Sequence, residues 1–201
     1  MRYRQMQDEF NFDEQTHTYY LNGLKIPSVT KVLQDAGLVK FFGNATENSR
    51  KFGDAMHLMT HYDDLGTLDV RSLDNNLKPY LLGYRKFLQK EKIVIIESEL
   101  RGYSKKYLFG WTLDKVGIKN GVKTIIDLKS GVINKLAVNL QTAAYKIGYN
   151  EYHKKDKAVK RGAVQLLPND YKYVQFDDKT DESVFLAFLT TMNYKKLHNI
   201  K

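Results

Sequence analysis

The stretch that most constrains the fold is 124–131, Thr-Ile-Ile-Asp-Leu-Lys-Ser-Gly. Its first half is apolar and β-branched, which predicts a buried strand. Because side chains alternate along a strand, Asp127 and Lys129 are expected on the same face. A carboxylate and an ammonium at the end of a buried strand are costly to desolvate unless some chemistry uses them. The stretch therefore predicts a polar centre at the end of a core strand.

A neighbouring strand is predicted at 107–116, before the strand at 122–129. Asn120-Gly121 between the two is a strong signal for a tight turn, so the pair is expected to form an antiparallel hairpin. Such a hairpin brings Asp114 and Asp127 to the same end of the two strands. The sequence thus offers two carboxylates for one site.

The rest of the chain alternates between the strand period and the helix period. In a strand at 93–100, strict alternation places Glu97 and Glu99 on one face. Further elements are expected as a hairpin at 10–27, helices at 28–37, 47–64, 77–90, 136–152 and 181–197, and short strands at 162–167 and 171–176. This order predicts an α/β (α+β) fold with a mixed central β-sheet flanked by helices. We expect a single domain, 1–201, with an N-terminal hairpin and helices in 1–92, the sheet core in 93–177 and a closing helix in 178–201.

Two of the predicted helices carry polar residues at helical spacing. In 47–64, Gly53 lies one turn before His57, and the glycine would let a backbone or a phosphate come close. Judged alone, a histidine such as His57 is more often a helix-packing or surface residue than a ligand. In 136–152, Gln141 and Tyr145 lie one turn apart as a polar pair. His57 and Glu99 are candidates to complete the site around Asp127.

Charge and the absence of cysteine limit the function. The formal net charge of +9 favours a polyanionic partner, with nucleic acid first, although a generic basic surface also explains it. The basic run after 136–152 includes Lys154, Lys155, Lys160 and Arg161, and is interpreted either as a phosphate-binding patch or as a solvated loop. Without cysteine there is no iron–sulfur cluster and no thiolate zinc site, so a metal must be held by oxygen and histidine ligands, which suits Mg²⁺ or Mn²⁺.

Phosphodiester hydrolysis needs such a metal together with an activated water. Asp114 and Asp127 are the expected metal ligands, and the backbone carbonyl of Leu128 is a further one. Lys129 would orient or deprotonate the attacking water and offset negative charge. Glu99 is the remaining candidate for a catalytic role. Asp-x-Lys alone is a weak motif because it often occurs by chance. An ordinary surface ion pair is the default interpretation of any single Asp and Lys in this arrangement.

The ordered set of motifs is more specific than any member of it. The chain resembles the RecB-type branch of the PD-(D/E)XK nuclease superfamily, in the compact form common among phage-encoded exonucleases. The similar segments are His17–Tyr20, Ile26–Thr30, Gly53–His57, Ser98-Glu99, Thr112–Asp114, Ile126–Gly131 and Gln141–Tyr145. The resemblance implies a restriction-endonuclease-like core, a metal bound by His57, Asp114, Asp127 and the Leu128 carbonyl, and a catalytic Lys129. It also implies that Gln141 and Tyr145 support the site and contact DNA.

The sequence departs from the family pattern at three points. Trp111 replaces the usual small glycine before Thr-x-Asp, with Gly110 one place earlier, and this indole would narrow the cleft, stack on a base or point to the core. The cysteine cluster of some relatives is absent, and so is the literal Pro-Asp pair. Access to the metal site is therefore the point on which the sequence says least.

The leading functional hypothesis is a Mg²⁺- or Mn²⁺-dependent deoxyribonuclease, an exonuclease in DNA recombination, repair or phage replication. The alternatives are a catalytically silent nucleic-acid-binding protein with the same fold, and a defence or restriction-type endonuclease. DNA is the expected partner, and the resemblance adds a recombinase or single-strand annealing protein and a homo-oligomer. The N-terminus has no apolar segment typical of a secretion signal, and the longest apolar runs, such as 184–189, are too short to span a membrane. A cytoplasmic location is expected.

Overall fold

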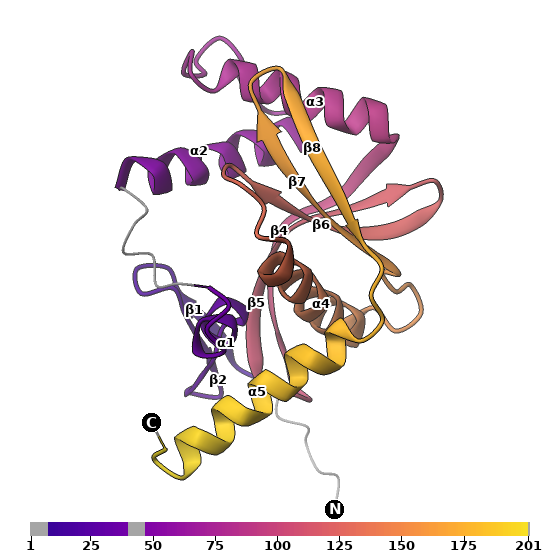
Figure 1. The fold of residues 1–201 in the computed structure, drawn as a ribbon. Coiled ribbons are helices and arrows are strands. Elements are labelled where there is room, and N and C mark those ends of the chain that lie inside the picture. Colours follow the sequence, from indigo (N-terminus) through magenta and orange to yellow (C-terminus); the bar gives the residue numbers. More distant parts are fainter. Residues whose placement is uncertain (1–7, 40–46, 201) are drawn as a thin grey trace, which may run out of the picture.

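The computed structural model describes residues 8–39 and 47–200, and its centre is a mixed five-stranded sheet. The strands follow one another in the order β4 (Ile93–Ser104), β5 (Phe109–Lys119), β6 (Val122–Lys129), β7 (Lys160–Leu167) and β8 (Asp170–Phe176). Only β6 and β7 pair in parallel, and the other three pairs are antiparallel. The predicted mixed sheet with flanking helices is confirmed, and Figure 1 shows its twist.

Helices cover both faces of this sheet (Figure 1). They are α1 (Val29–Asp35), α2 (Glu47–Asp64), α3 (Lys78–Glu91), α4 (Lys135–Tyr152) and α5 (Asp181–Leu197). The neighbouring residues Ile125 and Ile126 of β6 point to opposite faces, and they mark the two cores. Ile125 packs with α1, α4 and α5, whereas Ile126 packs with α2 and α3. Within the described parts of the chain, none of the helices combines the length and apolarity that crossing a bilayer requires.

Local sequence signals explain several of the boundaries. Asn120 and Gly121 both have positive φ, 50° and 75°, as a two-residue hairpin turn between β5 and β6 demands. Ser28 caps α1, since its hydroxyl accepts a hydrogen bond from the backbone N–H of Lys31. The bounds of α2, β6 and α5 agree with the sequence prediction. The hairpin that carries the two predicted carboxylates is therefore present.

The N-terminal segment contains one strand more than predicted. It forms a separate three-stranded sheet of β1 (Phe10–Asp13), β2 (Thr18–Leu21) and β3 (Leu24–Ile26). The additional turn depends on Asp13, whose carboxylate accepts hydrogen bonds from the backbone N–H groups of Gln15 and Thr16. The prediction of a single hairpin at 10–27 is thus incomplete, because it recognised only the turn at Asn22-Gly23.

Strand β4 is irregular, and this overturns one prediction. The register shifts between Ile95 and Glu97, and Glu99 has a φ of 56°. Glu97 accepts a hydrogen bond from the hydroxyl of Tyr149 on α4, whereas Glu99 contacts α2 on the other side of the sheet. The prediction that the two glutamates share a face is wrong, because it assumed a regular strand and the register shift interrupts the alternation of side chains.

Candidate active site

The candidate site lies where β5 and β6 part. Their pairing runs from Lys119↔Val122 to Lys115↔Ile126 and stops there, while β6 continues beside β7. Beyond the last pair, a carboxylate oxygen of Asp114, Oδ2, accepts a hydrogen bond of 2.6 Å from the backbone N–H of Leu128. A side chain thus takes the place of the strand ladder, and the Asp114 carboxylate is held at the opening.

Three ligand atoms from three elements meet beside this opening. His57 of α2, Glu99 of β4 and Asp114 of β5 offer one nitrogen and two carboxylate oxygens that all lie within 4.8 Å of one another. The Nδ1 atom of His57 lies 3.3 Å from Glu99 Oε1 and 3.6 Å from Asp114 Oδ1. Carboxylate oxygens suit Mg²⁺ and Mn²⁺ and an imidazole nitrogen suits transition metals, so this mixed set fits a divalent cation. Glu99, expected only as a catalytic residue, thus joins the group that can hold a metal.

Asp127 and Lys129 form a pair beside this group, as predicted from their spacing. The Lys129 ammonium donates a hydrogen bond of 3.0 Å to Asp127 Oδ1 and lies 2.8 Å from Oδ2. Asp127 is only 1% exposed, and no hydrogen bond from the described residues reaches its Oδ2 atom. This oxygen pairs with the Lys129 ammonium and, because a carboxylate oxygen can accept more than one contact, it keeps acceptor capacity for a further ligand. Asp127 is therefore a further residue that would hold a metal ion beside His57, Glu99 and Asp114.

The pKa values of these groups follow from their mutual charges. Burial alone would lower the pKa of His57, but Asp114, Glu99 and Asp127 outweigh it and raise this pKa to about 9. Burial raises the pKa of Asp127 to about 6, against the opposing effect of Lys129. The pKa of Lys129 is raised, because Asp127 and Asp114 overcome its desolvation. Without a metal, Lys129 is thus an ammonium and His57 an imidazolium among carboxylates.

The predicted supporting residues also lie at the site. Gln141 of α4 accepts a hydrogen bond of 3.3 Å from the Lys129 ammonium, and its amide donates one of 2.6 Å to the hydroxyl of Tyr145. Gly53 faces the residue after Lys129, since a Cβ at this position would lie 3.4 Å from Ser130 Oγ. The helices α2 and α4 therefore approach the end of β6 from its two sides.

Trp111 belongs to the core. It is 4% exposed and packs against Gly102 of β4 and Gly148 of α4, where a Cβ atom would clash with the indole. Of the three roles open to it from the sequence, the structure selects packing. The indole therefore does not obstruct the site.

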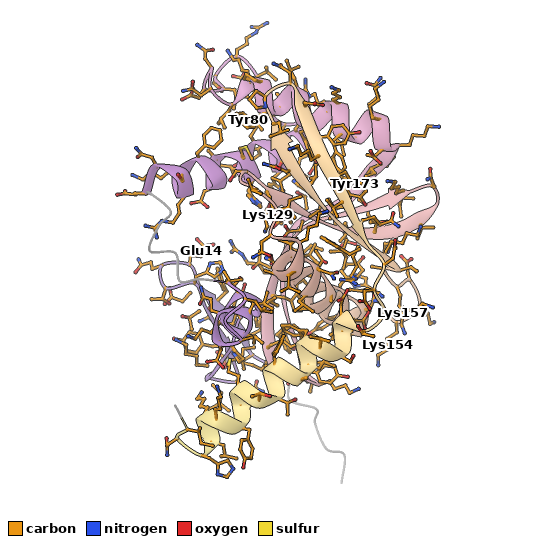
Figure 2. All side chains as sticks on the ribbon, in the orientation of Figure 1. Glu14, Tyr80, Lys129, Lys154, Lys157 and Tyr173 are labelled. Atoms are coloured by element: carbon orange, nitrogen blue, oxygen red, sulfur yellow. The ribbon has the colours of Figure 1, made fainter. Side chains whose placement is uncertain are left out.

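The basic run after α4 lies elsewhere. Figure 2 shows Lys154 and Lys157 well away from Lys129, and Lys160 begins β7 at the other end of the β6–β7 pair. Lys154, Lys155 and Lys160 are exposed, and DNA binding by them stays a prediction. Arg161 needs a correction, because it is 3% exposed and its guanidinium is bound by Asp181 and by the carbonyls of Asn139 and Asp178. It anchors α5 and is not available to a phosphate.

A buried polar network behind the site was not found from the sequence. Lys115 donates to Asp64 Oδ2 at 2.6 Å and to Ser98 Oγ at 2.7 Å, and the hydroxyl of Tyr84 donates to Asp64 Oδ1 at 2.5 Å. His61 contacts the same Ser98 hydroxyl at 3.0 Å. Three members are chain neighbours of the ligand group: His61 follows His57 by one turn, Ser98 precedes Glu99, and Lys115 follows Asp114. These adjacencies were the sequence signals for the network, and none of them indicates burial.

The site opens into a cleft of about 980 Å³. The three-stranded sheet and α1 line one side of this cleft, and α2 lines the other side with residues that include His57. Ser130 and Gly131, which follow β6, also line it. In Figure 1, α1 and the small sheet lie below α2 on the same side of the molecule. The described chain thus offers its candidate metal group a route to solvent that is wide enough for a substrate.

Comparison with known proteins gives no family assignment. No protein-family model matches the chain, and no curated protein matches it. Similar solved structures include SSO0001, with a TM-score of 0.38, 15% identity and 83% of each chain covered. The alkaline exonuclease LHK-Exo from Laribacter hongkongensis matches with a TM-score of 0.31 and 17% identity over 86% of this chain and 92% of that chain. LHK-Exo in complex with dAMP matches with a TM-score of 0.32 and 15% identity over 87% and 93%. These scores are low, and the proposals below are argued from the geometry of this chain.

Proposed function

We propose that this chain is a metal-dependent deoxyribonuclease of the RecB-like PD-(D/E)XK type. The observation that carries the proposal is the convergence of His57, Glu99 and Asp114 beside the buried Asp127–Lys129 pair, at the point where two core strands part. Buried charges of this kind lower stability unless they are used, and their number at one opening favours catalysis over a silent binding role.

His57, Glu99, Asp114 and Asp127 would hold Mg²⁺ or Mn²⁺, with the Leu128 carbonyl as a further ligand. When bound, such an ion neutralises charge on the phosphate and lowers the pKa of a coordinated water. His57 would have to lose its proton to serve as a ligand, since the coordinating nitrogen has to be free. Metal affinity is therefore expected to rise with pH in the neutral range.

Lys129 supplies the positive charge on the other side of Asp127. Its raised pKa favours the ammonium form, so of the two roles open to it we assign orientation of the attacking water and stabilisation of the phosphate oxygens. Gln141 accepts a hydrogen bond from the ammonium and is itself bonded to Tyr145, which fixes the direction of the lysine. In this proposal the carboxylates bind the metal ion, and Lys129 acts on the attacking water and the reacting phosphate.

Within this activity we propose an exonuclease that acts in DNA recombination, repair or phage replication. The cleft that the described residues form in front of the site supports an enzyme that takes a strand end. The test uses end-labelled linear DNA and covalently closed circular DNA, each with Mg²⁺, Mn²⁺ or EDTA. Loss of the linear substrate alone is expected. Nicking of the circle would favour an endonuclease, and a gel shift without cleavage in any metal would favour the silent binder.

Two variants connect the activity to the site. Asp127→Asn and Lys129→Met are each expected to lower cleavage at least 100-fold, because each removes a charge that acts on the reacting groups. Folding and DNA binding in EDTA should persist. Asp177→Asn and Lys172→Met make the same changes at exposed positions and serve as matched controls. Full cleavage by either site variant would refute the site assignment.

Metal binding has a readout that does not depend on cleavage. Mn²⁺ at 100 times its dissociation constant should stabilise the folded chain by about 2.7 kcal/mol. Glu99→Gln should lose most of this thermal shift, since it removes one anionic ligand. An equal shift in wild type and variant would exclude Glu99 as a ligand.

A further inference from the structure

The cleft that leads to the site has cations on opposite walls. Lys25 lies on β3 and Arg50 on α2, and both side chains are exposed and line the cleft. Neither has an ion-pair partner among the residues that the structure describes. Asp54 is the one carboxylate among the described lining residues. Two cations that face one cleft attract a polyanion and can contact successive phosphates.

The cleft is also bordered by an aromatic ring in an unusual backbone conformation. His17 has a φ of 50°, in the left-handed region that is uncommon for residues other than glycine and in which histidine, asparagine and aspartate are enriched. Its ring packs edge-on against Phe12 and Tyr19, with centroid distances of 4.9 and 5.9 Å, and remains exposed at the cleft. Residues in such conformations persist where surrounding packing fixes them, and they are frequent at ligand-binding sites.

The size of the cleft favours one strand over two. Its volume of about 980 Å³ is near the upper end of the range of about 300–1,000 Å³ typical of pockets that enclose one compact ligand. This space suits a few nucleotides of one strand and is small for a turn of duplex. A basic groove with an exposed ring is also the combination by which proteins bind single strands without reading sequence.

We propose that the cleft binds single-stranded DNA, with Lys25 and Arg50 as phosphate contacts and His17 as a stacking surface for a base. This inference rests on the proposed function and specifies its substrate as an unpaired strand that reaches His57 through the cleft. The small N-terminal sheet then has a defined role, because it supplies one wall of the strand path.

The test measures binding in EDTA, so that it does not depend on cleavage. Fluorescence anisotropy with a labelled 12-nucleotide dT strand and with the blunt dA·dT duplex gives the two affinities over 50–200 mM salt. Because each lost contact lowers the salt slope by about 0.7 for a single strand, Lys25→Gln/Arg50→Gln should lower it by about 1.4. The affinity ratio of wild type to variant should then be about seven times larger at 50 mM than at 200 mM salt. Lys172→Gln/Lys196→Gln makes the same charge change at exposed positions and should leave the slope near the wild-type value.

The stacking role is tested at His17. His17→Asn accepts the same backbone conformation but removes the ring, and should weaken dT binding about fivefold or more. His17→Phe keeps a ring but is less favourable at this φ, so it should bind dT more tightly than His17→Asn and more weakly than wild type. Wild-type affinity in His17→Asn would overturn the stacking role.

The outcomes separate this inference from the proposed function. Tighter binding of the duplex than of the strand, or an unchanged salt slope in the Lys25/Arg50 variant, would overturn the cleft proposal even if the chain cleaves DNA. Conversely, strand binding that depends on these residues would support the cleft proposal, even if no metal produced cleavage and the nuclease proposal failed.

Discussion

The buried ion pair behind the site gives a sharp test of the energetics. Lys115 and Asp64 have side chains that are 1% and 4% exposed, and their charged atoms lie 2.6 Å apart. Replacing one partner leaves the other charge in the core without compensation, which costs about 3–5 kcal/mol. Lys115→Met and Asp64→Leu should therefore each remove that much from the free energy of unfolding. This is a large part of the roughly 5–15 kcal/mol of a typical domain.

The double variant is the informative one. With both charges gone, Met and Leu occupy the space and no charge is left unpaired, although Tyr84 and Ser98 each lose a hydrogen bond worth about 1 kcal/mol. The double variant should be more stable than either single variant, whereas additive losses would make it about 6–10 kcal/mol less stable than wild type.

Urea denaturation provides the measurement. The single tryptophan, Trp111, is buried in the core on the α4 side, so its fluorescence reports global unfolding. A double variant that loses as much as the sum of the two single variants would refute the ion-pair reasoning. Losses below about 1 kcal/mol in both single variants would refute it as well, because they would show that neither charge is desolvated.

Two further predictions concern packing and pH. Gly148→Ala should lower the free energy of unfolding by about 1–3 kcal/mol in urea denaturation, because its Cβ would lie 2.2 Å from Trp111 Nε1. Gly131→Ala has open space around its Cβ and should be tolerated. Equal stability of the two variants would contradict the packing argument. Glu91 has its pKa lowered below 4.5 by a hydrogen bond from Lys119, so its stabilising effect is present above pH 4.5 and is lost as the pH falls through the folded-state pKa. The stability gap between wild type and Glu91→Gln should shrink in that acid range in urea titrations, and a gap that widens would contradict the sign.

The sequence could predict those parts of the site that depend on local rules. The pairing of Asp127 with Lys129 follows from strand alternation, and the position of Asp114 follows from the Asn120-Gly121 turn. The Gln141–Tyr145 contact follows from helix spacing. These features were recognisable because each involves residues close in sequence.

The remaining features depend on contacts between distant elements. A register shift in β4 turned Glu97 and Glu99 to different faces, and no local pattern marks that shift. Arg161 was interpreted as part of a phosphate-binding patch or a solvated loop, and no role was predicted for Lys115, yet each has a carboxylate partner from a distant element that permits its burial. Only tertiary packing identifies such partners, so burial of charge is what sequence patterns predict least well.

The conformation of Glu99 has a consequence for the directed evolution of this chain. A glutamate held at φ 56° is less favourable there than glycine or asparagine, by about 1 kcal/mol or more. A library screened only for thermal tolerance would therefore enrich substitutions at this position and discard the carboxylate nearest His57. Selection for thermal tolerance would favour glycine or asparagine at position 99, whereas selection for cleavage would favour glutamate. Preference at codon 99 would thus reveal which of the two a population has experienced.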